Sequence, residues 1–111
     1  MLQIEFEQRI LQFRQNYLNG LPEKAREIGD LIDRIENGDN DLPALQDLQS
    51  ELHRVRGVAP TFGFHELGEA AAEAEDAIRQ CLAGKMLFGH HEVLPVMVAV
   101  HRAMQGLIET A

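Results

Sequence analysis

The sequence predicts an all-α protein, an antiparallel up-down four-helix bundle with an additional N-terminal helix. Apolar residues recur every three or four positions along most of the chain, which is the period of a helix with one buried face. Strand-like alternation of useful length does not occur, and β-branched residues are few outside the last segment. At 111 residues the chain suffices for one core, so we expect a single domain over residues 1–111.

Three turn-like segments, "LNGLPE", "ENGDNDLP" and "AGKMLFGHHE", divide the chain. Short connections of this kind favour antiparallel neighbours, with the first helix as a cap on the other four. The five expected helices are residues 4–19, residues 22–36, a segment that follows Asp41, residues from about 63 to 84, and residues from about 90 to 109.

Four of the five expected helices carry a residue that suits their start or their end. Pro22 suits the first turn of the second helix, and Asp41 can cap the third, with Pro43 just inside it. Gly84 suits the position after the last residue of the fourth helix. The fifth helix carries a nearly continuous apolar sequence with Pro95 close to its first turn, and His101 is expected at its boundary or in the core.

The third helix has the sharpest pattern. One apolar stripe is expected to contain Leu42, Leu45, Leu48, Leu52, Val55, Ala59 and Phe62. At about 100° per residue, His53 points away from this stripe and faces solvent. The surface around it carries neither acidic nor bulky groups and consists of Gln46, Gln49, Ser50, Gly57 and Pro60. Arg54 and Arg56 flank this surface, which is unusual in a chain of net charge −8.

An exposed imidazole titrates near neutrality and is a competent nucleophile towards phosphorus. Gly57, one turn after His53, costs about 1 kcal/mol in a helix but leaves room for an incoming partner. Arg56 can pair with phosphoryl oxygens or with a partner's carboxylates. Glu75, at the margin of the fourth helix's apolar face, could accept a hydrogen bond from one ring nitrogen and leave the other free to attack. A surface histidine beside a tolerated glycine is the alternative interpretation.

Composition excludes several classes of function. The net charge of −8 argues against nucleic acid and against an anionic membrane surface as partners. The N-terminus lacks the apolar run of a signal peptide, and the chain has no apolar run long enough to span a membrane. Cys81 is the only cysteine, which suits a reducing cytoplasm and a role as core filler. His90 and His91 are adjacent on the chain and cannot easily bind one ion together, so no metal site is expected.

The segment "HRVRGVAPTFGFHEL" resembles the signature of histidine-containing phosphotransfer (HPt) domains. The signature positions in register are His53, Gly57, Ala59, Phe62, Gly63, Phe64 and Leu67, and the pattern continues to Ala71 and Glu75. The upstream segment from Phe13 is similar to the family's second helix and its Gly-Asp turn. Three positions depart from the pattern. Arg56 replaces a lysine, Val55 replaces a leucine, and Pro60 replaces a small residue and is expected to end or kink the third helix early.

The resemblance implies that His53 accepts a phosphoryl group from a receiver-domain aspartate and passes it to another receiver in a multistep two-component phosphorelay. It implies a monomeric cytoplasmic phosphoryl carrier without turnover of its own, whose partners are response-regulator receiver domains and a (hybrid) sensor histidine kinase. No intrinsic cofactor is expected, because the receiver supplies the Mg²⁺. Docking is expected on the rim around the third helix, with Gln49, Arg54 and Pro60 in contact with the partner.

Three other functions remain open at this stage. An HPt-like module could bind or sequester receivers without carrying phosphate. A dimerisation and phosphoacceptor domain of a sensor kinase would need a dimeric helical hairpin and a nucleotide-binding domain after it. A metal-binding bundle is the weakest of the three.

Overall fold

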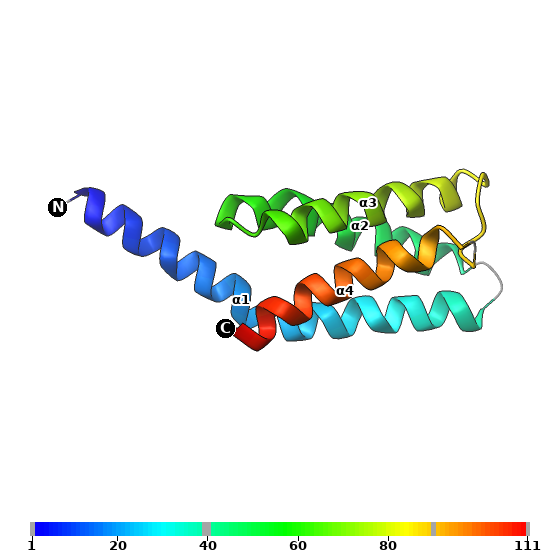
Figure 1. The fold of residues 1–111 in the computed structure, drawn as a ribbon, viewed down its shortest axis with the longest axis horizontal. Coiled ribbons are helices and arrows are strands. Elements are labelled where there is room, and N and C mark those ends of the chain that lie inside the picture. Colours follow the sequence, from blue (N-terminus) through cyan, green and yellow to red (C-terminus); the bar gives the residue numbers. More distant parts are fainter. Residues whose placement is uncertain (1, 39–40, 90, 111) are drawn as a thin grey trace.

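Four α-helices and one short 3-10 helix make up the fold (Figure 1). The computed structural model describes residues 2–38, 41–89 and 91–110, and no strand occurs among them. The elements are α1 (Leu2–Asn37), α2 (Leu42–Val58), η1 (Ala59–Phe62), α3 (His65–Leu82) and α4 (Val93–Thr110). Consecutive helices run in opposite directions in Figure 1, and α4 returns to pack against α1. The result is a helical bundle in which each helix contacts two others.

The separate N-terminal helix predicted from the sequence is wrong, because α1 is continuous through the expected break. Pro22 lies inside the helix rather than at its start. Proline cannot donate a hydrogen bond to the carbonyl of Leu18, so the helix bends instead of ending, and Figure 1 shows a change of direction near this point. Leu18, Leu21 and Ala25 are buried on both sides of Pro22, and their burial favours one helix over two.

The N-terminal part of α1 does not cap the bundle. It extends beyond the other three helices, and its end lies far from them in Figure 1. This extension gives the molecule a longest dimension of 56 Å against 23 and 22 Å in the other directions.

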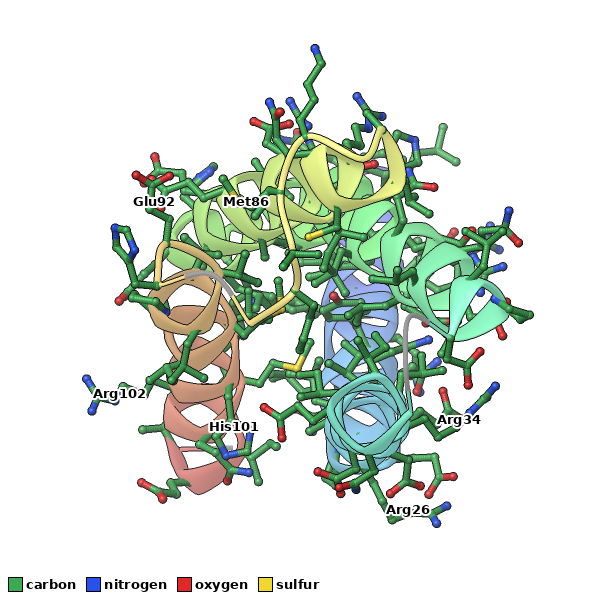
Figure 2. The ribbon with its side chains drawn as sticks, turned by 90° about the vertical axis from the view of Figure 1, so that its right-hand side faces the viewer. Arg26, Arg34, Met86, Glu92, His101 and Arg102 are labelled. Atoms are coloured by element: carbon green, nitrogen blue, oxygen red, sulfur yellow. The ribbon has the colours of Figure 1, made fainter. Side chains whose placement is uncertain are left out.

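The core runs along the axis of the bundle (Figure 2). Its largest fully buried apolar side chains are Leu21, Leu48, Leu52, Leu67, Ile78, Met104, Val55, Val93 and Val100. Arg26, Arg34 and Arg102 point outward from their helices in Figure 2. One expected core position is wrong, because Leu42, at the first turn of α2, is 52% exposed. His101, expected at the boundary of the last helix or in the core, is exposed on α4.

A tight corner joins α2 to α3. The start of α2 is capped as predicted, with the Asp41 carboxylate accepting from the amide of Ala44 at 3.0 Å. Its end is also as predicted, because α2 stops at Val58 and Pro60 falls in η1. Gly63 then adopts a left-handed conformation with φ of 86° and lets the chain reverse into α3.

A second turn follows α3, at the end of the bundle opposite to the corner between α2 and α3. Gly84 follows α3 with φ of 72° and donates to the carbonyl of Cys81, as expected of a glycine at this position. The fifth predicted helix corresponds to α4, which begins at Val93, and its expected start at His90 lies outside the described residues. Among the described helices, none combines the length and apolar character that crossing a bilayer requires.

Candidate functional site

Glu75 is the centre of a polar cluster between α2 and α3. The cluster consists of Glu75 and the four residues that contact its carboxylate, which are Gln49, His53, Arg56 and Arg79. The Glu75 side chain has no exposed surface, and it is the one buried charged residue among those the structure describes. The sequence placed it at the margin of the apolar face of α3, whereas it lies in the interior beside Ala71, Ala74 and Ile78. The short alanine side chains let α2 and α3 approach closely, so side chains from α2 reach the Glu75 carboxylate.

His53 lies above Glu75 with its ring largely in solvent. The imidazole Nδ1 is 2.9 Å from Oε2 and 3.2 Å from Oε1 of Glu75. The His53 side chain is 64% exposed, so the ring bridges the buried carboxylate and the outside. No hydrogen bond to Nε2 is formed by the described part of the chain. The structure therefore brings together His53 and Glu75, the two residues that the sequence assigned to nucleophile and orientation.

Two arginines approach the same carboxylate. Arg56 Nη1 lies 3.2 Å from Glu75 Oε1 and 3.5 Å from Asp76 Oδ1, and its side chain is 43% exposed. Arg79 Nη2 lies 3.1 Å from Glu75 Oε2. Both guanidinium groups are partly exposed, so donors that Glu75 does not use can reach a ligand bound at His53.

Opposing effects determine the pKa of Glu75. Burial is the largest single effect and raises it, because a charge loses its water. Hydrogen bonds from Gln49, His53 and Arg56, together with the charge of Arg79, act in the other direction, and the net result is a lowered pKa. Glu75 is therefore a carboxylate at neutral pH. A carboxylate only accepts hydrogen bonds, so a neutral His53 must carry its proton on Nδ1 and its lone pair on Nε2.

Gly57 leaves open space on the same face of α2 as His53. A Cβ added at this position would have no atom of the neighbouring structure within 4 Å. Gly57 is also exposed, so no packing inside the chain requires a glycine here. The helix thus carries an unfavourable residue whose absent side chain clears the surface one turn from the imidazole.

The three residues predicted to contact the partner, Gln49, Arg54 and Pro60, lie in different environments. Gln49 donates to Glu75 Oε2 at 2.7 Å and thus belongs to the polar cluster rather than to the free surface. Arg54 is exposed and pairs with Glu51 at 2.8 Å. Pro60 is half-buried in η1, and its ring lies so close to α3 that a Cβ on Gly68 would stand 2.6 Å from its Cγ.

Sequence reasoning missed Arg79 and the inward role of Gln49. Both could have been found from helical spacing, because Arg79 follows Glu75 by four residues and Gln49 precedes His53 by four. Such pairs are common on exposed helix surfaces. Only the burial of Glu75 in the structure distinguishes Arg79 and Gln49 from residues that form ordinary pairs on a helix surface.

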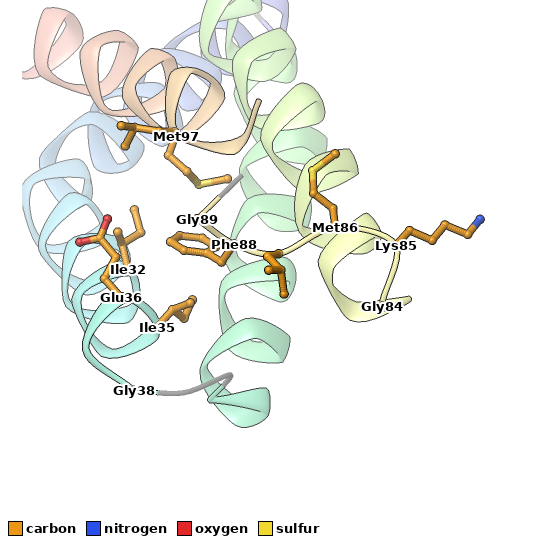
Figure 3. A pocket seen from close by; sticks show the side chains of 12 residues that line it. Ile32, Ile35, Glu36, Gly38, Gly84, Lys85, Met86, Phe88, Gly89 and Met97 are labelled. Atoms are coloured by element: carbon orange, nitrogen blue, oxygen red, sulfur yellow. The ribbon is translucent and has the colours of Figure 1, made fainter. Parts of the chain in front are cut away.

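A hollow in the described structure lies away from this cluster. It has a volume of about 980 Å³ and lies between the C-terminal end of α1, the connection after α3 and the start of α4. Figure 3 shows Phe88 between Ile35 and Met97 in this hollow. None of the residues of the polar cluster lines it. Over the described ranges, no three His, Cys, Asp or Glu side chains gather closely enough to hold a metal ion.

Comparison with known proteins agrees with the geometry. The sequence model of the Hpt domain, the histidine phosphotransfer module of two-component signalling, matches residues 7–109. The match includes α2 and α3 in full, most of α1 and of α4, and every residue of the polar cluster. No curated protein and no solved structure matches the chain. Since the match extends over nearly the whole sequence, the chain belongs to the Hpt domain family.

Proposed function

We propose that His53 is the phosphoacceptor and that the protein relays a phosphoryl group between the aspartates of two receiver domains. The observation that carries this proposal is the contact of His53 Nδ1 with the buried carboxylate of Glu75, which leaves Nε2 as the free nucleophile on an exposed ring. Family membership supports a phosphocarrier rather than an enzyme, with receiver domains and kinases as partners.

In the proposed transfer, the lone pair of Nε2 attacks the phosphorus of an aspartyl phosphate in line with the leaving oxygen. The bond between phosphorus and that oxygen breaks, and the aspartate departs as a carboxylate. The Nδ1 proton stays on the ring, which becomes a positively charged phosphoimidazole. Glu75 stabilises this charge because its own negative charge is held 2.9 Å away, and the reverse sequence returns the phosphoryl group to a second receiver.

Arg56 and Arg79 supply positive charge to the transferred group. Their pairing with Glu75 holds both guanidinium groups near the imidazole without any partner present. When His53 carries a phosphoryl group, its oxygens compete with Glu75 and Asp76 for the free donors of these arginines. Arg54, farther out on α2, is proposed to contact the acidic residues of the receiver, as is the surface around Pro60.

The remaining chemistry is assigned to the partner. Mg²⁺ is proposed to come with the receiver domain, where it stabilises the aspartyl phosphate, and this chain is expected to show no turnover alone. The proposed compartment is the cytoplasm, because a lone thiol such as Cys81 stays reduced there.

The test is transfer of radiolabelled phosphate from a panel of phosphorylated receiver domains. We expect label on the wild-type chain that is acid-labile and base-stable, and its loss in the His53→Gln variant. His101→Gln is the matched control, because His101 is also an exposed helical histidine but lies on α4. Label retained by His53→Gln would contradict the proposal. A variant that still supports signalling without label would assign the protein to receiver binding alone.

A further inference from the structure

The first fifteen described residues of α1, residues 2–16, form an N-terminal arm that projects from the bundle (Figure 1). Every buried residue of α1 lies at Leu18 or beyond. The arm nevertheless carries six large apolar residues that are at least 40% exposed, namely Leu2, Ile4, Phe6, Ile10, Leu11 and Phe13. Such a concentration on one projecting helix is unusual for a soluble monomer, in which exposed apolar side chains are scattered.

A helix of this length gains little stability in isolation. Helices shorter than about 12–15 residues are marginal in water, because most helical stability in proteins comes from packing of an apolar face. The arm is rooted firmly in the bundle, since Arg14 Nε donates to the carbonyl of Phe62 at 3.2 Å and its guanidinium lies 4.6 Å from the centre of the Phe64 ring. Beyond this root, the described chain provides no face against which the arm packs.

Four of the apolar residues form a stripe along one side of the arm. Leu2, Phe6, Ile10 and Phe13 follow at intervals of four, four and three residues. The same side continues to Tyr17, whose ring lies 5.6 Å from that of Phe62 and 6.1 Å from that of Phe64. The stripe thus leads directly into the aromatic contacts of the bundle. Ile4 and Leu11 lie on the other side of the arm.

The charges of the arm are arranged to complement those of an identical arm in the opposite direction. Glu5 and Glu7 lie in the half of the arm that is farther from the bundle, and Arg9 and Arg14 lie in the half that is nearer to it. The arm has no net charge, although the whole chain carries −8. A parallel pair would place like charges side by side. In an antiparallel pair, Glu7 of one copy faces Arg14 of the other, whose guanidinium uses only Nε for Phe62.

We propose that the protein forms an antiparallel dimer through its N-terminal arms, with a two-fold axis near Ile10. In this arrangement Phe6 of one copy packs against Phe13 of the other, and Leu2 reaches the other copy's Tyr17. The two stripes together bury on the order of 1,000 Å² of largely apolar surface, which is at the low end of what a stable interface requires. The resemblance to HPt domains implied a monomer, and the proposed dimer departs from that expectation.

The proposed dimer keeps the two acidic bundles apart. Each bundle lies at the opposite end of the paired arms, and an arm of fifteen residues is about 22 Å long. Repulsion over such a distance is screened at physiological ionic strength, where the Debye length is about 8 Å. None of the arm residues takes part in the polar cluster around Glu75, so His53 stays exposed in both copies.

The test is the mass of the 111-residue chain in solution, measured by sedimentation equilibrium from micromolar to several hundred micromolar concentration. We expect a species of twice the 12.5 kDa of one chain at the higher concentrations. Phe6→Glu should raise the dissociation constant more than about tenfold, because it places two charges in the centre of the apolar stripe. Gln8→Glu is the matched control. It adds the same charge at an exposed position on the other side of the arm and should leave the dimer intact.

A charge exchange tests the direction of pairing. Glu7→Arg should weaken the dimer because Arg14 of the other copy then faces a like charge, and adding Arg14→Glu should restore it. Circular dichroism checks that each variant keeps its helical bundle.

A single-chain mass for the wild type at every concentration would overturn the proposal, and so would a dimer that Phe6→Glu leaves unchanged. A monomer whose binding to a receiver domain or to lipid vesicles depends on Phe6 would assign the arm to that partner instead. Phosphotransfer by Phe6→Glu should match the wild type, which separates this test from that of His53.

Discussion

At the scale of single residues, Glu75 links the stability of the bundle to its chemistry. Burying a carboxylate is unfavourable unless hydrogen bonds and opposite charges compensate. Here Gln49, His53, Arg56 and Arg79 all do so, and they come from both α2 and α3. One side chain therefore holds two helices together and fixes the tautomer of the imidazole.

Glu75→Gln is expected to reduce both stability and transfer. An amide of the same shape cannot accept from all four donors, so we expect a loss of about 1–3 kcal/mol in the free energy of unfolding at neutral pH. Transfer to His53 should slow by about tenfold or more, which corresponds to about 1.4 kcal/mol in the activation barrier. Urea unfolding and the rate of labelling by a phosphorylated receiver measure the two effects.

The pH dependence of stability separates the charge of Glu75 from its shape. A carboxyl whose pKa is lower in the folded than in the unfolded state contributes stability that is fully present above its ordinary pKa, about 4.3 for glutamate. This contribution disappears as the pH falls through the lowered value. The wild type should therefore lose its advantage over Glu75→Gln in acid. An advantage that persists unchanged in acid would contradict a lowered pKa.

Gly57 lowers the stability of α2, and its proposed benefit is the access of a partner to His53. Because a Cβ would meet nothing within 4 Å, Gly57→Ala should raise the free energy of unfolding by about 0.5–1 kcal/mol. Transfer from a receiver should slow progressively from alanine to leucine at this position, since each added atom occupies the approach to His53. Gly106→Ala, at another exposed helical glycine with open space around it, should stabilise without affecting transfer. Normal transfer by Gly57→Leu would show that the open surface has no role.

At the scale of secondary-structure elements, the corner between α2 and α3 depends on a close contact. Pro60 ends α2, and its ring takes the space that a side chain on Gly68 would fill. This contact sets how near the start of α3 lies to the end of α2, and hence the spacing between Glu75 and the residues of α2 that reach it.

Gly68→Ala should destabilise the protein by about 1–3 kcal/mol, because the added Cβ would lie 2.6 Å from Pro60 Cγ. Thermal or urea unfolding measures the loss. Adding Pro60→Ala should recover part of it, since the smaller side chain removes the clash, and this non-additivity distinguishes a direct contact from a general loss of helix stability. Equal losses in the single and double variants would contradict the contact.

At the scale of the whole molecule, charge and apolar surface are separated. The bundle holds most of the negative charge, whereas the neutral arm holds six of the ten large apolar residues that the described structure leaves most exposed. The candidate phosphotransfer site lies between α2 and α3, where His53 and Arg56 contact Glu75. The arm projects from one end of the bundle (Figure 1). The proposed relay and the proposed self-association thus involve different surfaces, so we expect that each can be altered without the other.

Sequence periodicity by itself determined the helical class, the ends of α2, the glycine after α3 and the exposure of His53. These are local properties, because a cap, a proline or a heptad-like stripe acts within one or two turns. The spacing of His53, Gly57 and Glu75 also indicated which residues belong to one candidate site.

Only the tertiary structure decided that α1 passes through Pro22, because the burial of Leu21 before it and of Ala25 after it outweighs a local break signal. Tertiary structure likewise placed Glu75 in the interior and drew Gln49 and Arg79 to it. Burial depends on the approach of a second helix, and no pattern within a single helix specifies that approach.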